Sequence, residues 1–198
     1  VIEDIDERLR RSPKEEEVRE AVWTLNPYSA AGQDGIPGSF YRAAWDTVKG
    51  DAVQAVRDFF QGGHLPRIAS ATKVVLILKV GSRQYLEQYR PISVCNMPYK
   101  IIVVILNKRL EPHLNPWMGV GKNGFIKGIS IQGAIGVVQE VIPTIDNKIF
   151  GKNLDINLDM SKVYDRIELG FILMVLGYIG FYNSCDLIFH CFTSTWIS

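Results

Sequence analysis

The feature that most limits how this chain can fold is a stretch rich in leucine and isoleucine, 154–158, that leads directly into the carboxylate of Asp159. Tyr164 follows five positions later. Such a stretch predicts a strand over 153–159. A carboxylate at a strand end can bind a divalent metal ion, because hard cations prefer oxygen ligands. The same aspartate can also serve as the N-cap of a following helix, so the local pattern leaves both roles open.

Charge is unevenly distributed along the chain, although the net charge of +1 alone indicates no particular partner. At 198 residues and 47% hydrophobic, the chain is long enough to bury a sizeable core. The stretch 66–109 holds eight basic side chains against Glu87 alone. This excess is typical of a surface that binds phosphate groups, and a solvated basic face is the alternative. The eight are Arg67, Lys73, Lys79, Arg83, Arg90, Lys100, Lys108 and Arg109.

Several protein classes are disfavoured. The three cysteines and three histidines have no zinc-binding spacing, so we expect ordinary thiols in a reducing compartment. The start of the chain lacks the basic and apolar segments of a secretory signal. The apolar run 170–181 is too short for a membrane span. We therefore expect an intracellular protein with no membrane partner, whose oligomeric state the sequence does not indicate.

Local patterns predict an α+β fold that is rich in helices and has few, short strands. Ser12 and Glu15 have the spacing of a capping box, which predicts a helix up to about residue 26. Glycines and a proline within 32–38 predict a loop. Further helices are expected at 39–60, 99–110, 131–142 and 170–179. A buried strand is expected at 74–78, and Arg90 should be extended because a proline follows it.

The segment from Asp159 to Arg166 also resembles the reverse transcriptases of LINE-type (non-LTR) retrotransposons, especially plant ones. In that family the aspartate is followed by two variable residues and then Lys, Ala, an aromatic residue, Asp and Arg. Lys162, Tyr164, Asp165 and Arg166 match this pattern, and Val163 replaces the alanine. The resemblance runs from about Ala21 to the end. It implies the fingers and the first part of the palm of an incomplete right-hand polymerase.

The resemblance implies roles for individual residues. Asp159 would be a ligand of catalytic Mg²⁺, and Tyr164 would exclude the ribose 2′-OH, so that deoxynucleotides are selected. Arg90, within Tyr-Arg-Pro-Ile-Ser at 89–93, would contact the incoming triphosphate, because its planar fork suits phosphate oxygens. Lys79 would be a second phosphate contact, preceded here by Leu78 where the family has proline. Template and primer contacts would come from Gly32, Asp34, Gly35, Lys100, Lys108 and Arg109.

The turn at 31–37 keeps three of the residues that the family's Pro-Gly-Pro-Asp-Gly motif requires, Gly32, Asp34 and Gly35, and it loses both prolines. Glycines permit positive φ and a close approach of backbones. A purely structural turn is the alternative to contact with the RNA template.

Other positions depart from the family. Ile129 replaces an arginine, and Gly133-Ala134 replace an Asp-Asn pair. The family's second carboxylate pair has no counterpart within the 198 residues. We therefore expect a helical extension at 1–30, a fingers-like region at 31–152, and a partial palm at 153–198 that is truncated before that pair and inactive alone. The expected partners are an RNA template, a DNA primer and deoxynucleotides, in the nucleus or cytoplasm. The alternatives are a non-catalytic remnant that binds nucleic acid and a poorly folded relic.

Overall fold

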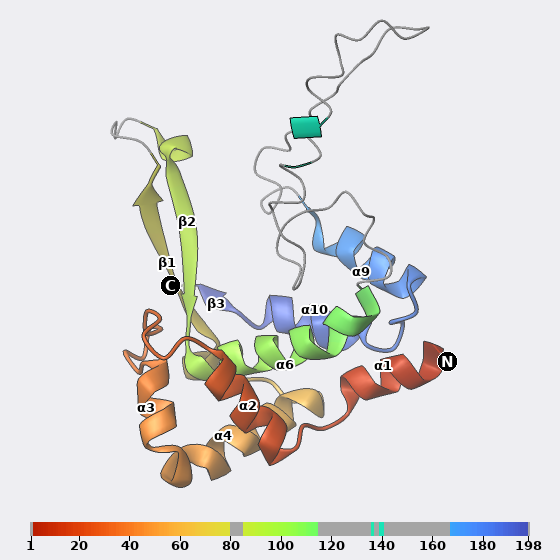
Figure 1. Ribbon diagram of the computed structural model, residues 1–198, viewed down its shortest axis with the longest axis horizontal. Coiled ribbons are helices and arrows are strands. Elements are labelled where there is room, and N and C mark those ends of the chain that lie inside the picture. The colour runs from red at the N-terminus through yellow and green to blue at the C-terminus, as the bar shows by residue number, and fades with distance from the viewer. Residues whose placement is uncertain (1, 80–84, 115–135, 137–138, 141–166, 198) are drawn as a thin grey trace, which may run out of the picture. The chain divides into compact units, whose positions relative to one another are not determined.

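The computed structural model describes residues 2–79, 85–114, 136, 139–140 and 167–197 (Figure 1). The chain divides into two compact units, one formed by 1–110 together with 169–198 and the other by 111–168. Most of the described residues belong to the first, discontinuous unit. Its elements are α1 (Ile2–Arg10), α2 (Glu15–Thr24), α3 (Gly38–Ala43), α4 (Trp45–Phe60), α5 (Arg67–Ser70), β1 (Ala71–Leu78), the 3-10 turn η1 (Leu86–Gln88), β2 (Tyr89–Cys95), α6 (Met97–Leu114), α9 (Leu169–Tyr178), α10 (Cys185–Thr193) and β3 (Trp196–Ile197).

Helices dominate this unit, and the strands form one small sheet, which is consistent with the predicted α+β class. The expected strand at 153–159 and most of the expected helix at 131–142 lie outside the described residues. The helix expected at 170–179 is confirmed by α9. Within the described ranges, no helix combines the length and the apolar character needed to cross a membrane.

The start of α2 differs from the predicted capping box. The helix begins at Glu15, so Lys14 and not Ser12 is the N-cap. Lys14 makes no side-chain capping bond, because an ammonium group has no acceptor for the N–H groups of the first turn. Three consecutive glutamates at 15–17 occupy the first turn, where their negative charge interacts favourably with the helix dipole. Val18, Ala21 and Val22 are buried, as the helical spacing predicted.

The prediction of a single helix over 39–60 is wrong, because α3 and α4 are separate helices. Ala44, between them, leaves the helical conformation with φ −102° and ψ 17°. The break places Trp45 at the start of α4, with its ring edge-on to Trp23 of α2 at 5.6 Å between centroids. The apolar periodicity continues across Ala44, so the sequence pattern gives no sign of it. Gly62, with φ +88°, follows α4 as expected of a terminating glycine.

β1 and β2 form an antiparallel hairpin that projects from the helices (Figure 1). Their register runs from Thr72 opposite Cys95 to Leu78 opposite Tyr89. β3 pairs with the first residues of β1 in parallel, which gives the order β2-β1-β3. The predicted strand and the extended Arg90 are confirmed, but the predicted burial is wrong. Residues 74–77 are between 36% and 51% exposed, because no second layer of described residues covers the hairpin.

α6 contributes several fully buried side chains to the core of the unit. Ile101, Ile102 and Ile105 have no exposed area. The helix extends to Leu114 and contains Pro112, where a stop was predicted. Pro112 lies in the last turn of the helix. Its missing N–H removes one backbone hydrogen bond there, close to the final carbonyls that lack partners within any helix.

Arg109 of α6 joins that helix to the end of α1 and the start of α2. Its guanidinium binds both carboxylate oxygens of Glu17 at 2.7 Å and donates to the carbonyls of Leu9 (2.9 Å) and Arg11 (2.6 Å). It also lies 4.8 Å from the centroid of the Phe60 ring. The side chain is 13% exposed. One cation therefore connects four separate positions of the fold.

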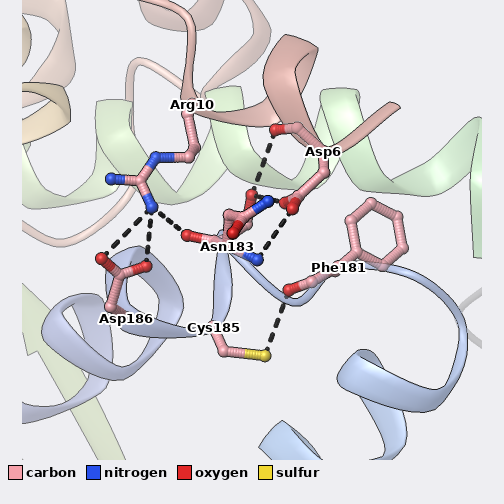
Figure 2. A network of polar contacts seen from close by, with 7 residues as sticks. Asp6, Arg10, Phe181, Asn183, Cys185 and Asp186 are labelled. Carbon is pink, nitrogen blue, oxygen red and sulfur yellow. Dashed lines mark hydrogen bonds and ion pairs between the residues drawn. The ribbon is translucent and has the colours of Figure 1, made fainter. Parts of the chain in front are cut away.

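Figure 2 shows how α1 is tied to the turn between α9 and α10. Asp6, which is 3% exposed, accepts hydrogen bonds from the backbone N–H of Asn183 at 2.7 Å and from the hydroxyl of Ser184. Arg10 pairs with Asp186 at 3.0 Å and donates to the carbonyl of Asn183. The beginning and the end of the described chain are thus held together by a buried carboxylate and a surface ion pair.

Substitution of Arg109 tests the importance of this link. Arg109→Ala removes the bidentate pair and leaves Glu17 and two carbonyls without their donor, so it should lower the free energy of unfolding by about 3 kcal/mol. The neighbouring Lys108→Ala is the matched control. Lys108 lies 3.7 Å from Glu20 and is 38% exposed, so its loss should cost less than about 0.5 kcal/mol. Urea unfolding followed by circular dichroism measures both, and equal midpoints would contradict the assignment.

Candidate nucleic-acid interface

The predicted turn at 31–37 is present. The N–H of Gly35 donates to the carbonyl of Gly32 at 3.2 Å, and Gly35 has φ +71°. The carboxylate of Asp34 accepts a hydrogen bond from the N–H of Ile36 at 3.0 Å, which fixes the side chain against its own backbone. The turn geometry therefore explains why Asp34 and Gly35 stand at these positions without any bound ligand.

Asn96, between β2 and α6, holds this turn in place. Its side chain is fully buried, accepts from the N–H of Asp34 at 3.3 Å, and donates to the carbonyl of Ile68. Gly32 lies directly against it, and a Cβ added to Gly32 would be 1.9 Å from Asn96 Oδ1 and 2.7 Å from its Cα. Gly32 is thus needed for a close approach.

Tyr41 of α3 lies near the same turn. Burial raises the pKa of the Tyr41 hydroxyl, and the negative charge of Asp34 raises it further. The phenol therefore stays neutral at physiological pH. It adds no negative charge to a surface that would have to accept phosphate groups.

A hollow of about 370 Å³ lies beside the turn. The guanidinium of Arg67 is 4.0 Å from the centroid of the Trp196 ring, which brings α5 and β3 together at this place. The hollow combines polar groups from the turn with this stacked pair. Residues that line it include Gln33, Asp34, Arg67, Ile68, Asn96 and Trp196.

The β1–β2 hairpin places two of the basic residues on one face. Residues that are directly opposite in an antiparallel pair share a face, and alternate residues of a strand do so too. Lys73 is opposite Val94 and Arg90 is opposite Ile77, so both basic residues belong to the face that carries odd-numbered residues of β1. Lys79 continues the same alternation just beyond β1, where its N–H donates to the carbonyl of Gln88. All three side chains are exposed.

Lys100, Lys108 and Arg109, which the resemblance also assigns to nucleic-acid contacts, have partners within the protein. Lys100 donates to the carbonyl of Ala30 at 2.9 Å, Lys108 lies near Glu20, and Arg109 binds Glu17 and two carbonyls. Their predicted role in binding nucleic acid stays a prediction, and each has an evident structural role.

Asp159 and Tyr164 lie outside the described residues, so the predicted metal site and the predicted sugar-excluding aromatic stay predictions. Among the residues that the structure describes, no three acidic, histidine or cysteine side chains gather closely enough to hold a metal ion. A Mg²⁺ site of this chain would therefore need ligands from outside the described residues.

Three residues of this region were missed as site residues. The buried side chain of Asn96 binds Asp34 across 62 positions of the sequence, so no local pattern indicates this contact. Arg67 was counted in the basic stretch, and Trp196 was not considered. An isolated arginine and an isolated tryptophan carry no local signal of stacking.

Comparison with known proteins gives a distant similarity. The chain is 23% identical over 176 residues to a 149 kDa protein of the transposon TX1 from Xenopus laevis, which is described as uncharacterized. The matched part covers 88% of this chain and 13% of the relative, so the chain spans a small fraction of that protein's length. No family model matches the chain. The chain is therefore similar to a transposon-encoded protein.

Substitutions of glycine test the packing at the turn. Gly32→Ala should destabilise the protein by about 1–3 kcal/mol, because the backbone and side chain of Asn96 occupy the space. Gly50→Ala, in the middle of α4 with nothing within 4 Å of the added Cβ, should stabilise it by about 0.5–1 kcal/mol. Thermal unfolding of both variants provides the comparison. A neutral Gly32→Ala would contradict the close approach.

Proposed function

We propose that this chain is the fingers region and the first part of the palm of a retrotransposon-derived, LINE-type reverse transcriptase, and that it binds RNA template and DNA primer through its basic hairpin. The observation that carries the proposal is the shared face of Lys73, Lys79 and Arg90. For two of these three, Lys79 and Arg90, the family resemblance implies contact with the incoming triphosphate, and the same cations can attract the phosphates of a bound strand. The similarity to a transposon protein over 88% of the chain supports the same origin.

The exposure of the hairpin supports a binding role. The hairpin exposes the apolar side chains of Val75, Ile77 and Ile92. A partner that covered the hairpin would remove this apolar surface from water. The cations at both ends of this apolar strip supply attraction to phosphate, and Arg90 can bind two oxygens at once. A nucleic acid laid along the hairpin would satisfy both properties.

Catalysis requires more than this hairpin. We propose that Asp159 supplies one carboxylate of a two-metal site and that Tyr164 selects deoxynucleotides. The 198 residues contain no partner for Asp159 from the family's second carboxylate pair, so by themselves they are proposed to lack nucleotidyl-transfer activity.

Binding of RNA by the hairpin is tested with a double variant, Lys73→Gln/Arg90→Gln. Each phosphate contact with a single strand contributes a slope of roughly −0.7 to log K against log[salt], so losing two contacts should make the slope less steep by about 1.4. Anisotropy of a labelled RNA oligonucleotide over a salt series measures this.

The control for that experiment is Lys49→Gln on α4. Lys49 is 42% exposed and lies near Glu15 (3.9 Å) and Asp46 (3.7 Å). Neither Lys49 nor these two partners belong to the hairpin. It removes the same type of charge and should leave the slope unchanged. An identical slope for the wild-type chain and the double variant would remove the hairpin from the proposal.

Primer extension tests the catalytic part. With an RNA template, a DNA primer, deoxynucleotides and Mg²⁺, the 198-residue chain and its Asp159→Ala variant should both give background incorporation. Extension by the wild-type chain that disappears in Asp159→Ala would show instead that these residues form a complete active site.

A further inference from the structure

Among the described residues, two exposed tryptophans each lie under an arginine. Arg67 is 4.0 Å from the centroid of Trp196, and Arg19 is 5.0 Å from the centroid of Trp23. The rings have similar exposure, 49% for Trp196 and 40% for Trp23. Each pair borders a hollow of a few hundred cubic ångströms. The two sites therefore share their stacking chemistry and differ in their surroundings.

The surroundings of Trp23 disfavour a polyanion. Its hollow is lined by Glu16, Arg19 and Glu20, so two carboxylates face one guanidinium. The hollow beside Trp196 has one carboxylate, Asp34, and one of its oxygens already accepts a hydrogen bond from the N–H of Ile36. Phosphate groups would be repelled at the first site and tolerated at the second.

The position of Trp196 in the sheet adds a second, independent argument. Trp196 pairs in parallel with Ala71, the first residue of β1. Ala71 belongs to the same alternation as Lys73, so Trp196 extends the face that carries Lys73 and Arg90. Lys73 lies two residues along β1 from Ala71, a distance of about 7 Å. An aromatic ring thus stands beyond Lys73, at one end of the face whose basic side chains flank an apolar strip.

We propose that Trp196, backed by Arg67, is a stacking site for one unpaired base of a single-stranded nucleic acid whose phosphates follow Lys73 and Arg90. This inference rests on the proposed function of the hairpin and specifies how the bound strand is held. Bases stack on exposed aromatic side chains whatever their sequence, and an arginine plane adds to the stack. The side-chain amide of Gln33, exposed at the rim of the hollow, can donate to and accept from the edge of the base.

The test measures binding of labelled rU and dT dodecamers to the full chain by fluorescence anisotropy. Trp196→Ala should weaken binding between roughly 5-fold and 150-fold, because one base stack is lost. Trp196→Phe should retain most of the affinity. The salt slope should not change in Trp196→Ala, since an indole carries no charge, whereas a lost phosphate contact would change it. Trp23→Ala is the matched control and should bind like the wild-type chain.

The outcomes separate this inference from the function on which it rests. Wild-type affinity in Trp196→Ala, together with a reduced slope in Lys73→Gln/Arg90→Gln, overturns the stacking site and leaves the hairpin as the binding surface. Absence of binding by the wild-type chain overturns both. Weakening with rU alone assigns the site to RNA, and weakening with both oligomers assigns it to single strands in general.

Ultraviolet crosslinking of the wild-type chain to 4-thiouridine RNA keeps the test valid if Trp196→Ala fails to fold. Mass spectrometry should then locate the crosslinked peptide at residue 196. A crosslink at Trp23 with none at Trp196 would overturn the assignment.

Discussion

Burial of α6 is the constraint on which the described structure depends. A helix that is apolar on nearly all sides has to be covered from several directions, and Ile101, Ile102 and Ile105 have no exposed area. Each such side chain contributes about 1.5–3 kcal/mol when it leaves water. The cover comes from distant parts of the chain. The hydroxyl of Tyr99 donates to the carbonyl of Cys191 in α10 at 3.0 Å, and Arg109 binds the end of α1 and the start of α2. Burial raises the pKa of Tyr99 well above its usual value, with Cys191 adding to the shift, so this donor keeps its proton.

The candidate interface derives its rigidity from the same helix. Asn96 precedes α6 by one residue, and its buried amide holds both the turn at 31–37 and the carbonyl of Ile68. β2 ends at Cys95, so the hairpin is anchored at the point where the core begins. The strands beyond that point are exposed and can meet a partner without disturbing the core. A stable core and an accessible, basic hairpin are therefore joined through one asparagine.

The elements of this fold were largely predictable, and the contacts between them were not. β-branched residues at 74–78 indicated a strand because that preference is local, but its exposure depends on which layers the rest of the chain supplies. Periodicity predicted one helix over 39–60, since Ala44 does not interrupt the apolar spacing. The resemblance implied a nucleic-acid contact for Arg109, and no local pattern indicated its partner Leu9, which is 100 residues away. The spacing of residues along a chain does not indicate contacts between residues so far apart in sequence. The roles of Asp159 and Tyr164 rest on the motif resemblance alone.

The link between Asp6 and Ser184 joins positions 178 residues apart, and the unit that contains them is interrupted by residues 111–168. This arrangement gives the chain a late closing step. A ribosome releases α1 to α6 long before α10, so the side of α6 that Tyr99 presents to Cys191 stays uncovered while the intervening segment is made. Contacts of such high sequence separation also slow folding, because the entropy of closing the loop is lost before they form. The nascent chain therefore depends on α10 to cover an apolar surface of α6 that was synthesised long before it.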